Sequence, residues 1–236
     1  MIKKLLDKEC ILKENLEKIK YNITNAAVRA GNSINDITIV AATKTISNDI
    51  INMAIKNGIT DIGENRVQEL LSKFDDISNA KVHFIGHLQK NKVKNIVGKV
   101  NMIQSVDSFD LAKKISQVSS NYGLCTDILV QVNIGNDKNK FGLKKDETKE
   151  LIYKLSNLSS IKVRGLMSIL PICDSKKALY NYFNDMRKLF IDISKERIDN
   201  ISMDFLSMGM SSDYIEAVEC GANMVRIGSA LFGTRS

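Results

Sequence analysis

Hydrophobic and polar residues follow a strand-then-helix order along most of the chain. Leu and Ile recur at helical spacing over residues 3–29, which predicts an amphipathic helix that Gly31-Asn32-Ser33 ends. Buried strands are then predicted from apolar runs that begin near Ile37, Ile59, Val82, Met102, Ile128, Val163, Met203 and Met224. Helical patterns lie between them at residues 48–56, 65–74, 89–97, 109–119, 145–158, 176–197 and 213–219. Eight strands alternating with helices predict parallel βαβ units.

Two α/β architectures fit this alternation, a closed (β/α)8 TIM-type barrel and an open doubly wound sheet. The count of eight strands and the length of 236 residues favour the barrel. An open nucleotide-binding sheet would usually carry a glycine-rich turn after its first strand, whereas residues 43–47 contain no glycine. No linker divides the sequence. We therefore expect one barrel domain over residues 1–236, with residues 1–30 as an extra helix packed on the barrel.

Composition narrows the possible functions. The amino-terminal residues lack an uninterrupted apolar segment, so we expect no secretory signal, no membrane span and a cytoplasmic protein. A net charge of +7 raises the question of nucleic acid, but the densest basic stretch, residues 89–95 with Lys99, has no interleaved aromatics and is typical of a solvated helix face. Two histidines and four widely spaced cysteines give no metal or disulfide signature.

Lys44 is the most informative residue. It stands where the first predicted strand, residues 36–43, emerges, and barrel enzymes place their chemistry at the carboxyl ends of their strands. A lysine held there and partly desolvated can lose its proton and attack a carbonyl to form a Schiff base. The alternative is an ordinary solvated surface lysine.

The loops after the last two strands suit an anion. Residues 207–213 form a glycine loop with three hydroxyls that opens a helix, and residues 228–233 repeat the pattern of glycine, hydroxyl and helix start. Loops after strands seven and eight form the recurrent phosphate site of barrels. An aldehyde for Lys44 and a phosphate for these loops together indicate pyridoxal 5′-phosphate (PLP).

Each element also has a simpler interpretation. Ser211, Ser212 and Asp213 are equally typical of helix caps. A lone histidine such as His83 is more commonly a core histidine with both nitrogens bonded. Arg226, at a strand end, is also explained as an ion-pair partner of Glu64 or Glu219.

Several segments resemble the pyridoxal phosphate homeostasis proteins, the YggS/PROSC family. They are residues 43–45, 62–69, 83–92, 164–167, 206–211 and 224–233, and they run in family order over nearly the whole chain. The resemblance implies a barrel similar to the amino-terminal domain of alanine racemase. It also implies a protein that holds PLP as a Schiff base on Lys44 and buffers or carries it for PLP-dependent apo-enzymes, without robust catalysis.

The resemblance further implies the cofactor contacts, with no catalytic and no metal-binding residue. Arg226 is placed like the racemase arginine that faces the pyridine nitrogen, where a guanidinium weakens the cofactor as an electron sink. The expected contacts are Lys44, Asn65, His83, Met167, Ser207, Gly209, Met210, Ser211, Arg226, Gly228 and Ser229.

The chain departs from the family pattern around the lysine. Residues 41–43 are Ala-Ala-Thr where Val-Ser is common, and Thr45-Ile46-Ser47 lacks the usual proline, which bears on the stiffness of the loop. The chain ends at Ser236 without the second domain of the racemases, so a two-base racemase is not expected. The alternatives are a PLP-dependent racemase or decarboxylase with His83 as proton donor, and a nucleic-acid-binding protein using Lys90, Lys92, Lys94 and Lys99. A monomer is the default expectation.

Overall fold

The computed structural model describes residues 2–77 and 79–233. Within these ranges eight parallel strands close into a barrel in chain order, and β1 pairs with β8. The strands are β1 (Thr38–Ala42), β2 (Asp61–Glu64), β3 (Lys81–Phe84), β4 (Met102–Val106), β5 (Thr126–Val132), β6 (Ile161–Ser168), β7 (Ile201–Ser207) and β8 (Met224–Ile227). The closed (β/α)8 barrel predicted from the sequence is confirmed, and the open sheet is excluded.

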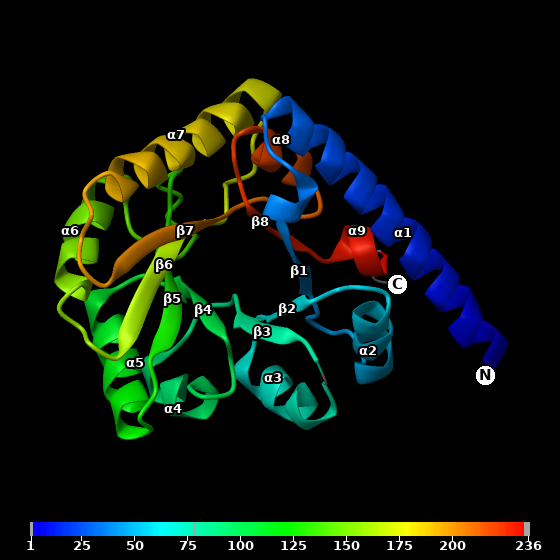
Figure 1. Ribbon diagram of the computed structural model, residues 1–236, viewed down its shortest axis with the longest axis horizontal. Coiled ribbons are helices and arrows are strands. Elements are labelled where there is room, and N and C mark those ends of the chain that lie inside the picture. The colour runs from blue at the N-terminus through cyan, green and yellow to red at the C-terminus, as the bar shows by residue number, and fades with distance from the viewer. Residues whose placement is uncertain (1, 78, 234–236) are drawn as a thin grey trace.

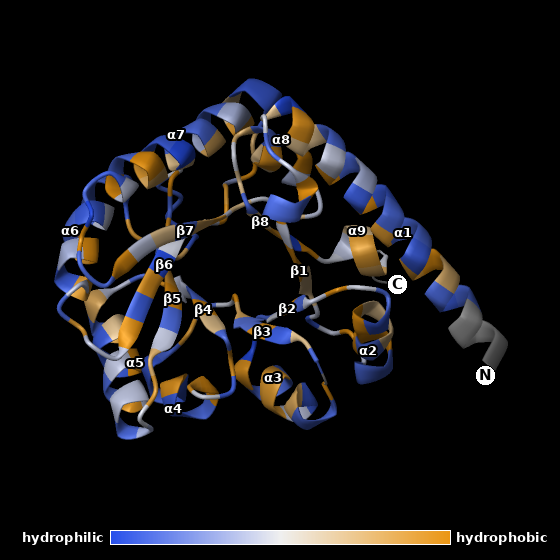
Figure 2. Cartoon of the chain, viewed as in Figure 1, coloured by the Kyte–Doolittle hydropathy of each residue, from blue (hydrophilic) through white to orange (hydrophobic). Residues whose placement is uncertain are grey.

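Helices surround the barrel (Figure 1). They are α1 (Ile2–Arg29), α2 (Asn48–Lys56), α3 (Val67–Lys73), α4 (Val93–Ile96), α5 (Phe109–Asn121), α6 (Lys145–Leu155), α7 (Lys176–Ser194), α8 (Tyr214–Glu219) and α9 (Ser229–Phe232). Short 3-10 helices cover Ile34–Asp36, Phe74–Asp76 and Lys90–Lys92. Hydrophobic and hydrophilic residues form stripes along α1 and α7 (Figure 2), because one face of each helix packs inward. In the described residues, no helix is long and apolar enough to cross a membrane.

The opening helix α1 packs on the end of the chain. Its buried face, which includes Leu16, Ile19 and Ile23, lies against α8 and α9. Asn15 Nδ2 donates to the Leu231 carbonyl at 3.0 Å, and Arg29 pairs with Glu219 at 2.6 Å. The helix therefore buttresses the two segments that follow β7 and β8.

Successive side chains of a strand point to opposite faces, which divides the interior into two cores. The larger core lies between the strands and the helices, whereas a small cluster fills the barrel lumen. The lumen cluster consists of Val40, Met102, Leu129, Met167 and Met224, with Ile169 and Phe205 packed against it. These side chains fill the barrel lumen. A ligand site is therefore expected at the end of the barrel and not inside it.

The predicted strands begin within two residues of the observed ones. The second strand begins at Asp61, two residues after the predicted start at Ile59. The Asp61 side chain lies at the amino end of β2 and is almost fully buried, beside His83. The predicted helix 89–97 is a 3-10 turn followed by the single-turn helix α4.

Candidate functional site

A cavity of about 710 Å³ lies at the carboxyl ends of β1, β7 and β8. It is lined by Ala42, Lys44, Ile46, Met210, Ser211, Ser212, Arg226, Gly228, Ser229, Ala230, Phe232 and Gly233. Six of the eleven predicted contact residues are brought together here: Lys44, Met210, Ser211, Arg226, Gly228 and Ser229. Segments nearly two hundred residues apart thus meet at one end of the barrel, because β1 pairs with β8.

Lys44 reaches this cavity from a turn just beyond β1. Thr43 follows the strand, and the Ile46 amide donates to the Thr43 carbonyl at 3.0 Å, which closes the turn over Lys44 and Thr45. Lys44 is an exposed residue, as the surface-lysine alternative expects. What the turn supplies is a primary amine at the edge of a defined cavity.

Arg226 lies on the neighbouring strand β8 and is only 4% exposed. Its Nη1 donates to Ser207 Oγ at 2.6 Å and its Nη2 to the Ser168 carbonyl at 2.7 Å. Burial lowers the pKa of Arg226 to about 10, so the guanidinium stays charged near neutral pH. The alternative of an ion pair with Glu64 or Glu219 is not what forms, since Glu64 pairs with Lys73 and Glu219 with Arg29.

A chain of buried side chains continues from Arg226 through the lumen. Ser207 Oγ donates to Gln104 Oε1 at 2.7 Å, and Gln104 Nε2 donates to His83 Nδ1 at 3.0 Å. His83 Nε2 lies 2.8 Å from Asp61 Oδ1, so the bonding pattern places the ring proton on Nε2. Burial raises the pKa of Asp61, but the bonds from His83 and Thr60 hold it below its ordinary value.

Two predicted contact residues belong to this series of hydrogen-bonded side chains and do not line the cavity. Ser207 and His83 are both buried, and neither is among the residues that line the cavity. His83 has the partners that the core-histidine interpretation requires, on β2 and β4. Gln104 was missed by sequence reasoning, although its alternation with Met102 on the inward face of β4 was a usable signal.

The loop after β7 supports the cavity through its backbone. Gly209 has φ +90°, and a Cβ there would lie 2.6 Å from Ala217 Cβ, so this glycine is required by packing. Its carbonyl accepts from the Arg226 amide at 3.0 Å. Asp213 Oδ1 accepts from the Met210 amide at 2.6 Å, within the loop rather than in helix α8. Burial raises the pKa of this carboxyl above its ordinary value.

Ser211 links the two loops that follow β7 and β8. Its Oγ accepts from the amides of Gly228 and Ala230, at 3.1 and 3.2 Å, at the start of α9. The helix-cap interpretation is therefore right in kind, but the helix that Ser211 caps is α9, not the one that begins at Tyr214. Hydroxyls and amides from both loops consequently converge at one edge of the cavity.

Asn65 and Met167 lie elsewhere. Asn65 is half-buried directly after β2, and a Cβ on Gly86 would come within 2.0 Å of its carbonyl oxygen, so the two backbones touch. Met167 is fully buried in the lumen cluster. Neither lines the cavity.

The lining gives the cavity a definite character. Among the described residues that line it, the charged ones, Lys44 and Arg226, are both basic. Ile46, Phe232 and Met210 supply apolar walls, none of which was singled out from the sequence for that role. The volume falls within the ~300–1,000 Å³ typical of small-molecule sites. The arrangement suits a small anion that has an apolar ring and a group reactive toward amines.

The basic stretch from residue 89 does not contribute to this site. Lys90, Lys94 and Lys99 are exposed, while Val93 and Ile96 turn into the core. Lys90 pairs with Asp110 at 3.1 Å, and Lys99 lies over the Phe74 ring. These contacts match the solvated helix face that the sequence favoured.

Comparison with known proteins identifies the family to which the chain belongs. Residues 15–236 match the family described as alanine racemase, N-terminal domain. A pyridoxal phosphate homeostasis protein of Aquifex aeolicus is 38% identical over 224 residues, which cover 94% of this chain and 97% of that protein.

Solved structures agree with the fold. PipY of Synechococcus elongatus, solved with PLP bound, superposes with a TM-score of 0.82 at 28% identity, covering 94% of this chain and all of PipY. An alanine racemase of Clostridium difficile superposes with a TM-score of 0.76 at 18% identity, covering 95% of this chain and 59% of the racemase, which shows the shared barrel alone. The chain belongs to the pyridoxal phosphate homeostasis protein family, which is built on the alanine racemase N-terminal fold.

Proposed function

We propose that this chain binds PLP through a Schiff base on Lys44 and serves intracellular PLP homeostasis as a buffer or carrier without robust catalysis. PLP-dependent apo-enzymes would be the recipients. The observation that carries the proposal is the meeting, in one cavity, of the Lys44 amine, the Arg226 guanidinium and the hydroxyl loops after β7 and β8. The PLP held by PipY, a relative of matching fold, supports it.

The residues present fit the parts of PLP. We assign the phosphate to the Ser211 and Ser229 hydroxyls, beside the backbone of Gly228 and Met210, whose amides already donate to Ser211 and Asp213. A Cβ on Gly228 would come no closer than 3.4 Å to its neighbours, so the absence of a side chain there leaves room beside the backbone. The apolar walls suit the pyridine ring.

Lys44 forms the covalent link. Its unprotonated Nζ would be the nucleophile toward the aldehyde carbon of PLP, and the aldehyde oxygen would leave as water. When bound, PLP supplies an electrophilic carbon that the lysine holds reversibly. An exposed lysine suits reversible capture, because water and competing amines can reach the link.

Five predicted contact residues do not line the cavity, and in this proposal they support the residues that do. Ser207 and Gly209 hold Arg226 in place, and His83 anchors the buried chain that ends at Ser207. Asn65 and Met167 contribute packing around the site.

Weak catalysis follows from the composition of the cavity wall. Racemisation needs a proton donor opposite the lysine, yet the described lining residues include no His, Asp, Glu, Cys or Tyr. His83, the candidate that a racemase or decarboxylase would use, is bonded to Asp61 and Gln104 below the cavity. A charged Arg226 facing the ring nitrogen would also weaken the cofactor as an electron sink.

Absorption spectroscopy tests the covalent link. Titration of the wild-type protein with PLP should produce a new visible band, which Lys44→Ala abolishes and Lys90→Ala leaves intact. Lys90 is a suitable control because it is an exposed lysine away from the cavity. An unchanged band in Lys44→Ala would refute the assignment of the lysine.

Solvent deuterium exchange separates a carrier from an enzyme. With a panel of amino acids, the loaded protein should exchange the α-hydrogen no faster than free PLP does. Exchange well above that rate for any amino acid would favour the racemase or decarboxylase alternative.

A further inference from the structure

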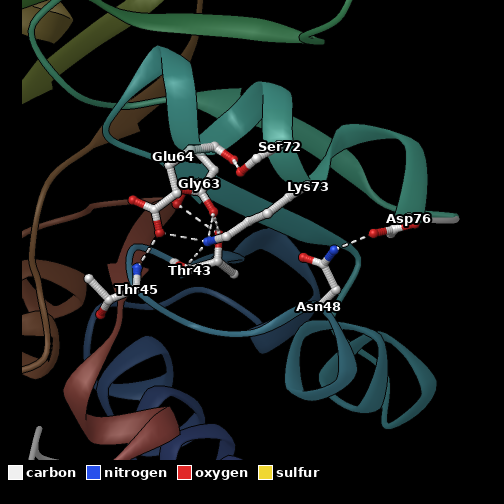
Figure 3. A network of polar contacts seen from close by, with 9 residues as sticks. Thr43, Thr45, Asn48, Gly63, Glu64, Ser72, Lys73 and Asp76 are labelled. Atoms are coloured by element: carbon white, nitrogen blue, oxygen red, sulfur yellow. Dashed lines mark hydrogen bonds and ion pairs between the residues drawn. The ribbon is translucent and has the colours of Figure 1, made fainter.

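An ionic network contacts Thr43 and Thr45, the two neighbours of Lys44 in the chain (Figure 3). Lys73, at the end of α3, is 8% exposed and donates all three of its ammonium hydrogens. Its Nζ lies 2.9 Å from Glu64 Oε1, 2.7 Å from Glu69 Oε1 and 2.9 Å from the Thr43 carbonyl oxygen. Thr43 Oγ1 also donates to Glu64 Oε1, at 2.6 Å. We call Glu64, Glu69 and Lys73 the α3 clamp.

The clamp holds both peptide groups that flank Lys44. The carbonyl of Thr43 belongs to the peptide before Lys44, and Lys73 binds it. The amide of Thr45 belongs to the peptide after Lys44, and it donates to Glu69 Oε1. Since φ and ψ of Lys44 are rotations between these two peptides, the clamp fixes the direction in which the lysine side chain leaves the backbone.

The turn that the clamp holds has an unfavourable backbone conformation at Thr45. Thr45 has φ +65°, which is unusual for a β-branched residue. Lys44 itself is exposed, and its side chain lines the cavity on the other side of the turn. The clamp therefore holds the backbone without occupying the amine.

We propose that Glu64, Glu69 and Lys73 are positioning residues that pre-orient Lys44 for covalent capture of PLP. This inference rests on the proposed function, since it presumes that Lys44 is the residue that captures. Held peptides reduce the number of directions that the lysine chain must search, which raises the fraction of encounters in which Nζ reaches the aldehyde carbon. The phosphate contacts and the Met210 and Phe232 walls come from the segments after β7 and β8, which the clamp does not contact.

The test compares covalent capture with non-covalent binding in the same variants. Capture is the rate at which PLP appears on Lys44, trapped with borohydride and located by peptide mass mapping. Non-covalent binding is measured with pyridoxine 5′-phosphate, which has an alcohol in place of the aldehyde and forms no link with lysine. Glu69→Ala and Lys73→Met should slow capture about tenfold, with pyridoxine 5′-phosphate affinity within about twofold of wild type.

Two further variants make the result specific. A single Glu69 oxygen accepts both bonds, so Glu69→Gln keeps an acceptor in place and should capture within about threefold of wild type. Glu150→Ala removes an exposed carboxylate with the same i,i+4 spacing to a lysine, on α6, and should change nothing. Should Lys73→Met fail to fold, Glu69→Ala carries the test, because the Glu69 side chain is 19% exposed.

The outcomes are distinguishable. Wild-type capture rates in both Glu69→Ala and Lys73→Met would overturn the positioning role. A parallel loss of pyridoxine 5′-phosphate affinity would also overturn it, because it would show that the whole cavity had been disturbed. Absence of label on Lys44 in the wild-type protein would refute the proposed function itself, before any clamp variant is compared.

Discussion

The two sides of the cavity are held by opposite means. On the β1 side Lys44 is exposed, and contacts from the outer face of the barrel fix its backbone. On the β8 side Arg226 is buried, and contacts from the lumen fix the guanidinium itself. The difference matches the proposed chemistry: an amine that would form and release a bond is left free at its tip, whereas a guanidinium that would only set a charge is held by two hydrogen bonds.

The largest effect on stability is expected on the β8 side, at Gly209. Gly209→Ala combines a left-handed backbone with a Cβ placed 2.6 Å from Ala217 Cβ, and should lower the free energy of unfolding by about 3 kcal/mol. Gly228→Ala is the matched control, since its Cβ would come no closer than 3.4 Å to neighbouring atoms. Urea denaturation checks both; equal losses in the two variants would show that Gly209 is not specially constrained.

The lumen chain should come next. Gln104→Leu leaves the Ser207 hydroxyl hydrogen without its acceptor and His83 Nδ1 without its donor in a buried site, and should cost about 2 kcal/mol of unfolding free energy. Gln68→Leu changes an exposed glutamine on α3 and serves as the control, with an effect within about 0.5 kcal/mol. If Gln104→Leu did not change the free energy of unfolding, the hydrogen bonds from Ser207 through Gln104 to His83 would not be what holds Arg226.

A smaller effect of opposite sign is expected on the β1 side. Thr45→Asn should stabilise the protein by about 1 kcal/mol, because asparagine tolerates φ +65° better than a β-branched residue does. Thermal unfolding measures the change. A loss of stability would mean that the threonine side chain contributes more than its backbone conformation costs.

The smallest effect is a difference in pH dependence inside the α3 clamp. Burial raises the pKa of Glu69, but the bonds from Lys73 and the Thr45 amide bring it below its ordinary value of 4.5. Its stabilising contribution is therefore complete above that value and is lost as the pH falls through the lower folded-state pKa. Burial raises the pKa of Glu64 above 4.5, so its contribution runs the other way and declines as the pH rises past that value.

Unfolding measured between about pH 3 and pH 6 checks these signs. Glu69→Gln should lose its disadvantage relative to wild type toward the acid end, by under about 1 kcal/mol, because solvent screens a partly exposed carboxylate. Glu64→Gln should show its smallest disadvantage at the neutral end. Identical pH profiles for the two variants would contradict the opposite shifts.

The sequence was most informative where a residue type or its position after a strand indicates one structural role. β-branched runs located the strands, and Lys44, Ser211 and Gly228 were predicted from their positions after strand ends, which the barrel brings together. Arg226 was expected from the family resemblance, which places it like the racemase arginine that faces the pyridine nitrogen. The predictions of the strands and of the residues after strand ends need only the periodicity of a strand and the topology of a barrel.

The contacts that could not be predicted are those between side chains that only the folded structure brings together. Glu69 and Lys73 resemble an ordinary surface pair at i,i+4, and nothing in the spacing says that they close on Thr43 and Thr45. His83 was placed on the right strand, but whether it faces ligand or Asp61 depends on side-chain packing across three strands. The stiffness that a proline would give the loop is supplied here by distant side chains.

Reduction of the PLP-loaded protein with borohydride, followed by peptide mapping, tests the role of Lys44 most directly. The predicted result is a single pyridoxyl group on the peptide that contains Lys44, at close to one per chain. Label on another lysine, or none at all, would contradict the assignment of Lys44 as the anchor.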